Sequence, residues 1–93
     1  MALSIEQQLA ALFREAGSVH HQAFAATNGV DPDWPIWYAD YLAPRLERVV
    51  GRAVETATLA ADLRAVDAEH RHVARGEPWS DYYARWFVLR LGR

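Results

Sequence analysis

Residues 31–42, which read DPDWPIWYADYL, place four large aromatic rings behind an Asp-Pro-Asp start, with a second proline after the first ring. If this segment is helical, Trp34, Trp37, Tyr38 and Tyr41 are spaced i, i+3, i+4 and i+7 and share one face. An aromatic face of that size must be buried against the rest of the chain, a ligand or a partner. This requirement constrains the fold more than any other feature of the sequence.

The length of 93 residues, with 52% hydrophobic and 24% charged residues, predicts a single globular domain spanning residues 1–93. The absence of cysteine excludes disulfides and thiol nucleophiles, and it favours a cytoplasmic location. The first residues carry no secretory signal, and no apolar run is long enough to span a membrane. A net charge of −2 without a concentrated basic patch excludes a nucleic-acid partner.

The first helix is predicted over Ser4–Thr27. Ser4 and Gln7 have the spacing of a capping box, in which each side chain bonds the backbone N–H of the other residue. Asn28 and Gly29 both tolerate the left-handed conformation, so they are expected to end this helix.

The aromatic segment is predicted to form a second helix over Asp33–Ala43, with Asp33 as N-cap and Pro35 in the first turn. Pro44 removes a backbone hydrogen bond from any helix that contains it. It therefore predicts a break, followed by a short helix over Arg45–Val50. A single kinked helix through Pro44 is the alternative.

A further long helix is expected to begin at a Thr56 or Thr58 cap and to stop at Gly76. Pro78 is expected at the first position of the last helix, which fades at Gly92. No stretch alternates with the period of a strand. The predicted fold is an all-α, compact bundle of four or five helices, in which two long antiparallel helices are each followed by a short aromatic helix packed across them.

A second aromatic segment, Trp79–Phe87, repeats the spacing of the first. When Trp34 is aligned with Trp79, Trp37 aligns with Tyr82, Tyr38 with Tyr83, Tyr41 with Trp86 and Leu42 with Phe87. With a two-residue gap before the turn, the long helices also align, Leu12 with Leu59, Ala16 with Leu63 and Val19 with Val66. Either the chain is a tandem of two units, or two amphipathic aromatic helices align by chance. Both readings make the two aromatic stripes the main stabiliser of the core.

Four histidines lie near the ends of the two long helices. Neighbouring helical side chains point about 100° apart, so only one of His20 and His21 faces the core, and the apolar stripe favours His20. His70 continues the stripe of its own helix, whereas His72 points away.

A metal or acid/base site would join His20 or His21 to His70, assisted by Asp67 or Glu69 at helical spacing. Too few further ligands are present, so we expect no metal and no cofactor. The alternative is that these histidines simply sit at helix C-termini, where the helix dipole favours them.

Tyrosines of both aromatic helices, with a histidine at the base, are typical of a mostly apolar pocket with few polar groups. Such a pocket suits a flat small molecule, although the rings also fit a purely structural core. The predicted ligand-binding residues are His20, His21, Trp37, Tyr38, Tyr41 and His70.

Residues 20–24 (HHQAF) and 31–42 resemble a motif of small uncharacterised bacterial helical proteins, H-H-x-A-[FY] followed by D-W-P-x-W-Y-A-x-Y-[LM]. The likeness covers residues 15–42 well and the remainder loosely. It implies that the His pair and the aromatic helix belong to one unit, and it carries no activity.

Three function classes follow, in order of preference. The first is a small-molecule binding or accessory protein that uses the aromatic and His pocket. The second is a protein-interaction module or homodimer that uses its aromatic surface. The third is a small enzyme that uses a His with Asp or Tyr as an acid/base pair.

Overall fold

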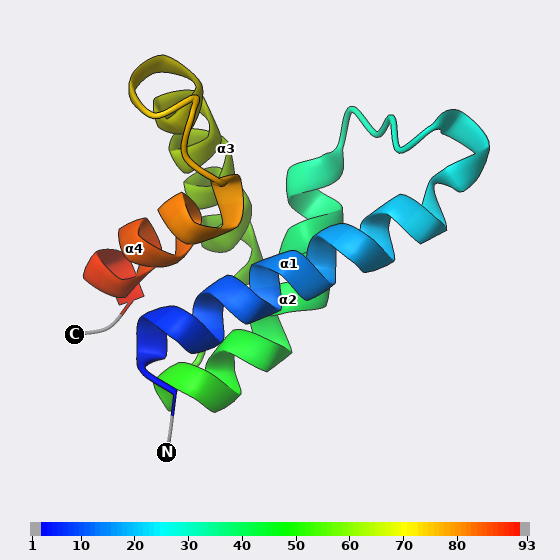
Figure 1. The fold of residues 1–93 in the computed structure, drawn as a ribbon. Helices are drawn as coiled ribbons and strands as arrows, with labels where there is room; N and C mark the ends of the chain where they lie inside the picture. The colour runs from blue at the N-terminus through cyan, green and yellow to red at the C-terminus, as the bar shows by residue number, and fades with distance from the viewer. Residues whose placement is uncertain (1–2, 92–93) are drawn as a thin grey trace.

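A computed structural model describes residues 3–91, which fold into four α-helices and one short 3-10 helix, with no strand among them. The elements are α1 (Ile5–Ala23), η1 (Ala25–Thr27), α2 (Trp34–Val50), α3 (Thr56–Val73) and α4 (Trp79–Leu91) (Figure 1). The all-α fold class and the helical bundle predicted from the sequence are therefore confirmed.

The start of α1 is as predicted and its end is not. The Ser4 hydroxyl accepts from the Gln7 N–H at 3.1 Å, and the Gln7 side chain accepts from the Ser4 N–H at 2.9 Å. The helix ends at Ala23, where the Phe24 N–H bonds the His20 carbonyl and the 3-10 turn η1 follows. The Thr27 hydroxyl can donate to the carbonyl of Phe24 or to that of Val30, at 3.1 and 2.9 Å, and either bond holds this turn. Asn28, with φ 55°, then adopts the left-handed conformation expected there.

Helix α2 continues through Pro44, so the predicted break and the separate helix over Arg45–Val50 are wrong. Leu42 and Leu46, one turn apart around the proline, are both fully buried. Their burial offsets the lost backbone bond. The Arg45 guanidinium also donates to the Tyr41 carbonyl at 2.7 Å, within the turn that Pro44 disturbs.

The second half of the chain begins and ends its helices near the expected positions. Helix α3 starts at Thr56, but its N-cap is Glu55, and it stops at Val73 before reaching Gly76. Pro78 precedes the first residue of α4, and its carbonyl accepts the Tyr82 N–H at 3.1 Å. The predicted end at Gly92 lies outside the described residues.

The helices pack in an order different from the expected one. Helix α1 lies mainly against α4 and α2, while α3 lies mainly against α2 and to a smaller extent against α4 (Figure 1). The two long helices α1 and α3 make few direct contacts with each other. The space between their C-terminal halves is therefore lined by the aromatic helices.

The core is largely aliphatic. Within residues 3–91 its largest fully buried side chains are Leu9, Phe13, Pro35, Leu42, Leu46, Leu59, Leu63, Val66 and Phe87. On α2 the four rings of the aromatic stripe are only half-buried, and the neighbouring face, with Ala39 and Leu42, enters the core. The expectation that the aromatic stripes are the main stabiliser of the core is therefore wrong for α2. Only α4 sends stripe residues, Tyr83 and Phe87, fully inside.

Burial repeats along the two halves of the chain. Ala39 and Leu42 of α2 correspond to Ala84 and Phe87 of α4, in the register predicted from Trp34 and Trp79. In α1 and α3 the buried pairs are Leu9 with Leu59, Phe13 with Leu63 and Ala16 with Val66. This alignment of α1 with α3 is shifted by three residues from the predicted one. It makes His20 and His70 equivalent positions of the repeat.

Candidate functional site

A cavity of about 440 Å³ lies where the four helices and the α1–α2 connection converge. Its aromatic walls are Trp34 and Tyr38 of α2 and Trp79 and Tyr83 of α4. Its polar lining is His20, Asp31, Asp67, His70 and Arg71, and Gly29 contributes backbone. We call this the central cavity.

The four aromatic walls meet edge to face. Trp34 and Tyr38 have centroids 5.7 Å apart at 89°, and Tyr38 and Trp79 are 6.4 Å apart at 82°. Trp79 and Tyr83 are 5.1 Å apart at 76°. Each contact is of the favourable T-shaped kind. The rings therefore form a series of nearly perpendicular panels.

Gly17 gives Trp79 its place in this series. A Cβ atom at Gly17 would lie 3.0 Å from Cζ2 of Trp79 and 3.7 Å from the Tyr38 hydroxyl. Real Cβ atoms essentially never approach closer, so the indole would have to yield. A glycine within α1 costs about 1 kcal/mol relative to alanine, and here it leaves room for one wall of the central cavity.

His20 is held in a fixed orientation. Its Nε2 lies 3.1 Å from Oδ2 of Asp31, and the two side chains are 9% and 10% exposed. The other Asp31 oxygen accepts the Asp33 N–H at 3.1 Å. The imidazole stacks on Phe24 at 4.7 Å and meets the edge of Trp37 at 4.9 Å.

This orientation leaves Nδ1 of His20 available. A carboxylate accepts hydrogen bonds, so Nε2–H is the donor to Asp31 and a neutral ring keeps a lone pair on Nδ1. The His20 imidazole forms no other hydrogen bond within residues 3–91, and no buried side-chain nitrogen or oxygen there lacks a partner. Nδ1 is therefore open to the cavity or solvent.

Both tyrosines of the cavity have a pKa above the ordinary value, and one of them donates a hydrogen bond within the protein. The Tyr83 hydroxyl donates to Asp67 at 2.9 Å, and Asp67 also pairs with Arg71 at 3.1 Å. Burial, reinforced by the Asp67 charge, raises the pKa of Tyr83 well above its usual value. Burial also raises the pKa of Tyr38, whose hydroxyl has no protein partner within residues 3–91.

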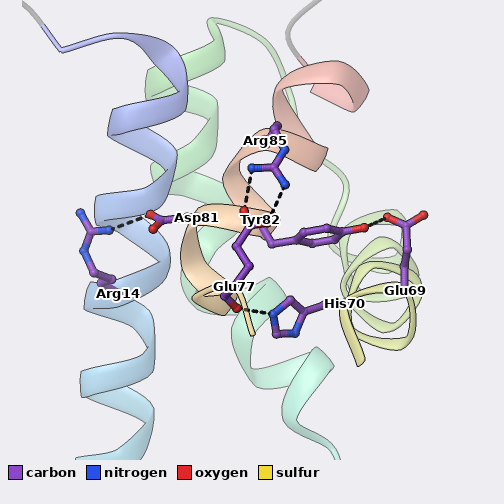
Figure 2. A network of polar contacts seen from close by, with 7 residues as sticks. All are labelled: Arg14, Glu69, His70, Glu77, Asp81, Tyr82 and Arg85. Atoms are coloured by element: carbon purple, nitrogen blue, oxygen red, sulfur yellow. Dashed lines mark hydrogen bonds and ion pairs between the residues drawn. The ribbon is translucent and has the colours of Figure 1, made fainter. Parts of the chain in front are cut away.

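His70 ties α3 to the segment that leads into α4. Its Nε2–H donates to the Glu77 carbonyl at 2.7 Å, which fixes the ring because a carbonyl only accepts (Figure 2). The Glu77 carboxylate binds both guanidinium nitrogens of Arg85, at 2.7 and 3.0 Å. Arg85 accordingly lowers the pKa of Glu77.

Two further contacts in Figure 2 anchor the start of α4. The Tyr82 hydroxyl donates to Glu69 of α3, and Arg14 of α1 reaches Asp81 at 3.4 Å. Helix α4 is thus connected to both long helices, which holds Trp79 and Tyr83 at the cavity.

The structure brings together three of the six predicted site residues. His20, Tyr38 and His70 line the central cavity. His21 is exposed and lies against Gly29, where its Nδ1 would be 3.3 Å from an added Cβ atom. Only His20 of the adjacent pair faces inward, as the helical pattern favoured.

Trp37 and Tyr41 belong to a different cluster. Their rings stack at 5.3 Å and 8°, and the Arg45 guanidinium lies 3.7 Å above the Tyr41 ring. The Tyr41 hydroxyl donates to Glu15 of α1. Neither residue lines the central cavity, so the predicted stripe divides between two places.

Sequence reasoning omitted several lining residues from the predicted site. Asp31 was interpreted only as an acid at the start of the aromatic segment, and Trp34, Trp79 and Tyr83 as parts of the aromatic stripes. The alignment of Tyr38 with Tyr83 was the available signal, because equivalent positions of a repeat face the same space.

Within residues 3–91 no three His, Asp or Glu side chains cluster closely enough to hold a metal ion. None of the helices described there is long and apolar enough to cross a membrane. Comparisons with protein-family models, curated proteins and solved structures found no match to this chain.

Proposed function

We propose that this protein binds a small molecule in the central cavity, as a binding or accessory protein. The observation that supports this most strongly is the meeting of four aromatic rings and five polar side chains around one space of about 440 Å³. Small-molecule sites occupy about 300–1,000 Å³ and combine apolar walls with a few polar groups.

Two polar atoms give such a ligand its orientation. His20 Nδ1 and the Tyr38 hydroxyl have no hydrogen-bond partner among residues 3–91, and because no buried side-chain nitrogen or oxygen there is unpaired, both atoms are accessible from the cavity or solvent. A polar atom that already has a protein partner adds little to ligand selection, whereas an accessible one without a partner can bond a complementary ligand. Both atoms are held in place by neighbouring rings, since His20 and Tyr38 lie 5.1 Å apart.

A thermal-shift screen with a metabolite library tests this proposal. At least one compound should raise the melting temperature of the wild type, because ligand binding to the folded state stabilises it. His20→Ala should abolish that shift. His21→Ala is the matched control, since the neighbouring His21 is exposed and lies outside the cavity. Equal shifts in both variants would contradict the proposed site.

A small His-dependent enzyme is the second candidate, and the His20–Asp31 pair favours it. Asp31 holds one ring nitrogen, and the other is left for a proton transfer to or from a bound substrate. Conversion of the screened ligand by wild type, together with retained binding but no turnover in His20→Gln, would support this candidate.

The location and relatives of the protein are part of the proposal. The cysteine-free sequence fits a reducing compartment, which favours the cytoplasm. The motif in residues 20–42 supports membership of the small bacterial helical proteins that it resembles.

A further inference from the structure

We infer that the central cavity takes a small organic cation, an ammonium group that carries alkyl substituents. This inference rests on the proposed function and names its ligand class. It follows from the arrangement of the walls, the charge of the lining and the protonation of the tyrosines.

The walls suit a rounded cationic group. Aromatic faces attract cations because their π systems carry negative charge, and Trp and Tyr do so strongly. The interplanar angles of 89° for Trp34 and Tyr38, 82° for Tyr38 and Trp79 and 76° for Trp79 and Tyr83 place each ring nearly perpendicular to its neighbour in the series. Adjacent panels at such angles cannot sandwich a flat ring between them, whereas a tetrahedral ammonium can touch several faces at once.

The charge of the lining favours a cation. With the histidines counted as neutral, Asp31 and Asp67 contribute two negative charges and Arg71 contributes one positive charge, which leaves −1. Arg71 is 73% exposed on its side chain and is paired with Asp67, so it offers an anion little. Within residues 3–91 Asp31 contacts the His20 ring and the Asp33 N–H but no Lys or Arg, and its side chain is 10% exposed, so its negative charge is poorly screened.

The hydroxyls and His20 complete the match. Because Tyr38 and Tyr83 stay neutral, their rings remain ordinary π systems and their oxygens can accept from a ligand. Nδ1 of His20 offers a lone pair to an N–H or O–H of the ligand. The volume of the central cavity, about 440 Å³, lies in the lower part of the usual range for ligand sites. This volume favours a free small molecule over a large one.

Isothermal titration with choline chloride and with its neutral carbon isostere, 3,3-dimethylbutan-1-ol, tests the charge directly. Sodium chloride keeps the ionic strength equal in both titrations. Choline should bind at least about tenfold more tightly, since only the charge differs. Equal binding of the two compounds, or binding of the isostere alone, would overturn the inference.

Variants locate the cation. Trp34→Leu should weaken choline binding about tenfold and leave the isostere almost unchanged, because it removes a π face and keeps an apolar side chain. Trp86→Leu is the matched control, since Trp86 is also half-buried but does not line the cavity. Asp31→Asn keeps the shape and should weaken choline selectively. Loss of choline binding in Trp86→Leu, with none in Trp34→Leu, would overturn the assignment.

The outcomes separate this inference from the proposed function. If a neutral or flat compound binds and His20→Ala abolishes its binding, the cavity is a ligand site and the cation is wrong. If neither choline nor any library compound binds, both the cation inference and the proposed function are wrong. A trimethyllysine peptide and phosphatidylcholine vesicles identify the source of the group. If either of these binds more tightly than choline, the ligand group is still an alkylated ammonium, but the inference that it belongs to a free small molecule is wrong.

Discussion

Nε2 of His20 lies 3.1 Å from Oδ2 of Asp31, and this contact joins the last turn of α1 to the connection that leads into α2. One side chain comes from a helix and the other from a loop, and both line the central cavity. The pair therefore fixes the loop and orients a cavity histidine at the same time.

Removal of this pair should be costly. We predict that His20→Gln lowers the free energy of unfolding by about 2–3 kcal/mol, because it leaves the buried Asp31 carboxylate without its partner. His21→Gln, at the exposed neighbouring position, should stay within about 0.5 kcal/mol of wild type. Urea unfolding at neutral pH measures both. Equal losses would mean that the pair contributes little.

Gly17→Ala should destabilise the protein by about 1 kcal/mol. Alanine favours a helix by about that amount over glycine, but the added Cβ meets Trp79 at 3.0 Å and must displace a packed ring. Ser18→Ala, at the adjacent exposed position, should be neutral or slightly stabilising. Thermal unfolding measures the difference, and a more stable Gly17→Ala variant would show that the indole yields freely.

Pro44→Ala should stabilise the protein by about 1–3 kcal/mol. Proline inside a helix removes a backbone bond and is about 3 kcal/mol worse than alanine, while its rigidity in the unfolded chain returns part of this. Pro44 is exposed, so alanine loses little packing. Chemical denaturation tests this. A destabilised variant would mean that the bend at Pro44 is needed for the packing of Leu42 and Leu46.

Stability should fall above pH 10. The folded state raises the pKa of Tyr38 and Tyr83 above their ordinary value of 10.0, so unfolding releases protons once the pH exceeds that value. The unfolded state then binds fewer protons, and stability declines by about 1.4 kcal/mol per pH unit for each such tyrosine. Below pH 10 this contribution is fully present.

Tyr83→Phe should flatten this alkaline decline. Urea unfolding at pH 9, 10.5 and 11.5 measures the slope for wild type and variant. Tyr82→Phe on the same helix is the comparison: the hydrogen bond to Glu69 also raises the pKa of Tyr82, but Tyr82 is more exposed than Tyr83, so its removal should flatten the slope less. An unchanged slope in Tyr83→Phe would contradict the neutral, buried state of this phenol.

The local features of the fold were readable from the sequence. The Ser4 and Gln7 capping box and the left-handed Asn28 each depend on a few neighbouring residues, and both were predicted correctly. Pro44 shows the limit of local reasoning. Its intrinsic cost predicted a break, whereas the burial of Leu42 and Leu46 through tertiary contacts kept α2 continuous.

The candidate site was readable only in part for a similar reason. Helical spacing correctly turned His20 inward and His21 outward. Spacing cannot give the angle at which α4 crosses the other helices, and this angle brings Trp79 and Tyr83 to the cavity. Nor could it show that Asp31, in an irregular connection, folds back onto His20.

The indole N–H signals of the four tryptophans offer the most direct test of ligand binding in the central cavity. They can be assigned in a nitrogen–proton NMR spectrum by single Trp→Phe substitutions and followed as choline, and then the metabolite library, is added. The signals of Trp34 and Trp79 should move in a saturable way, while that of Trp86, which lies outside the cavity, stays in place. If no compound moves the Trp34 and Trp79 signals, or if Trp86 alone responds, the central cavity is not the ligand site.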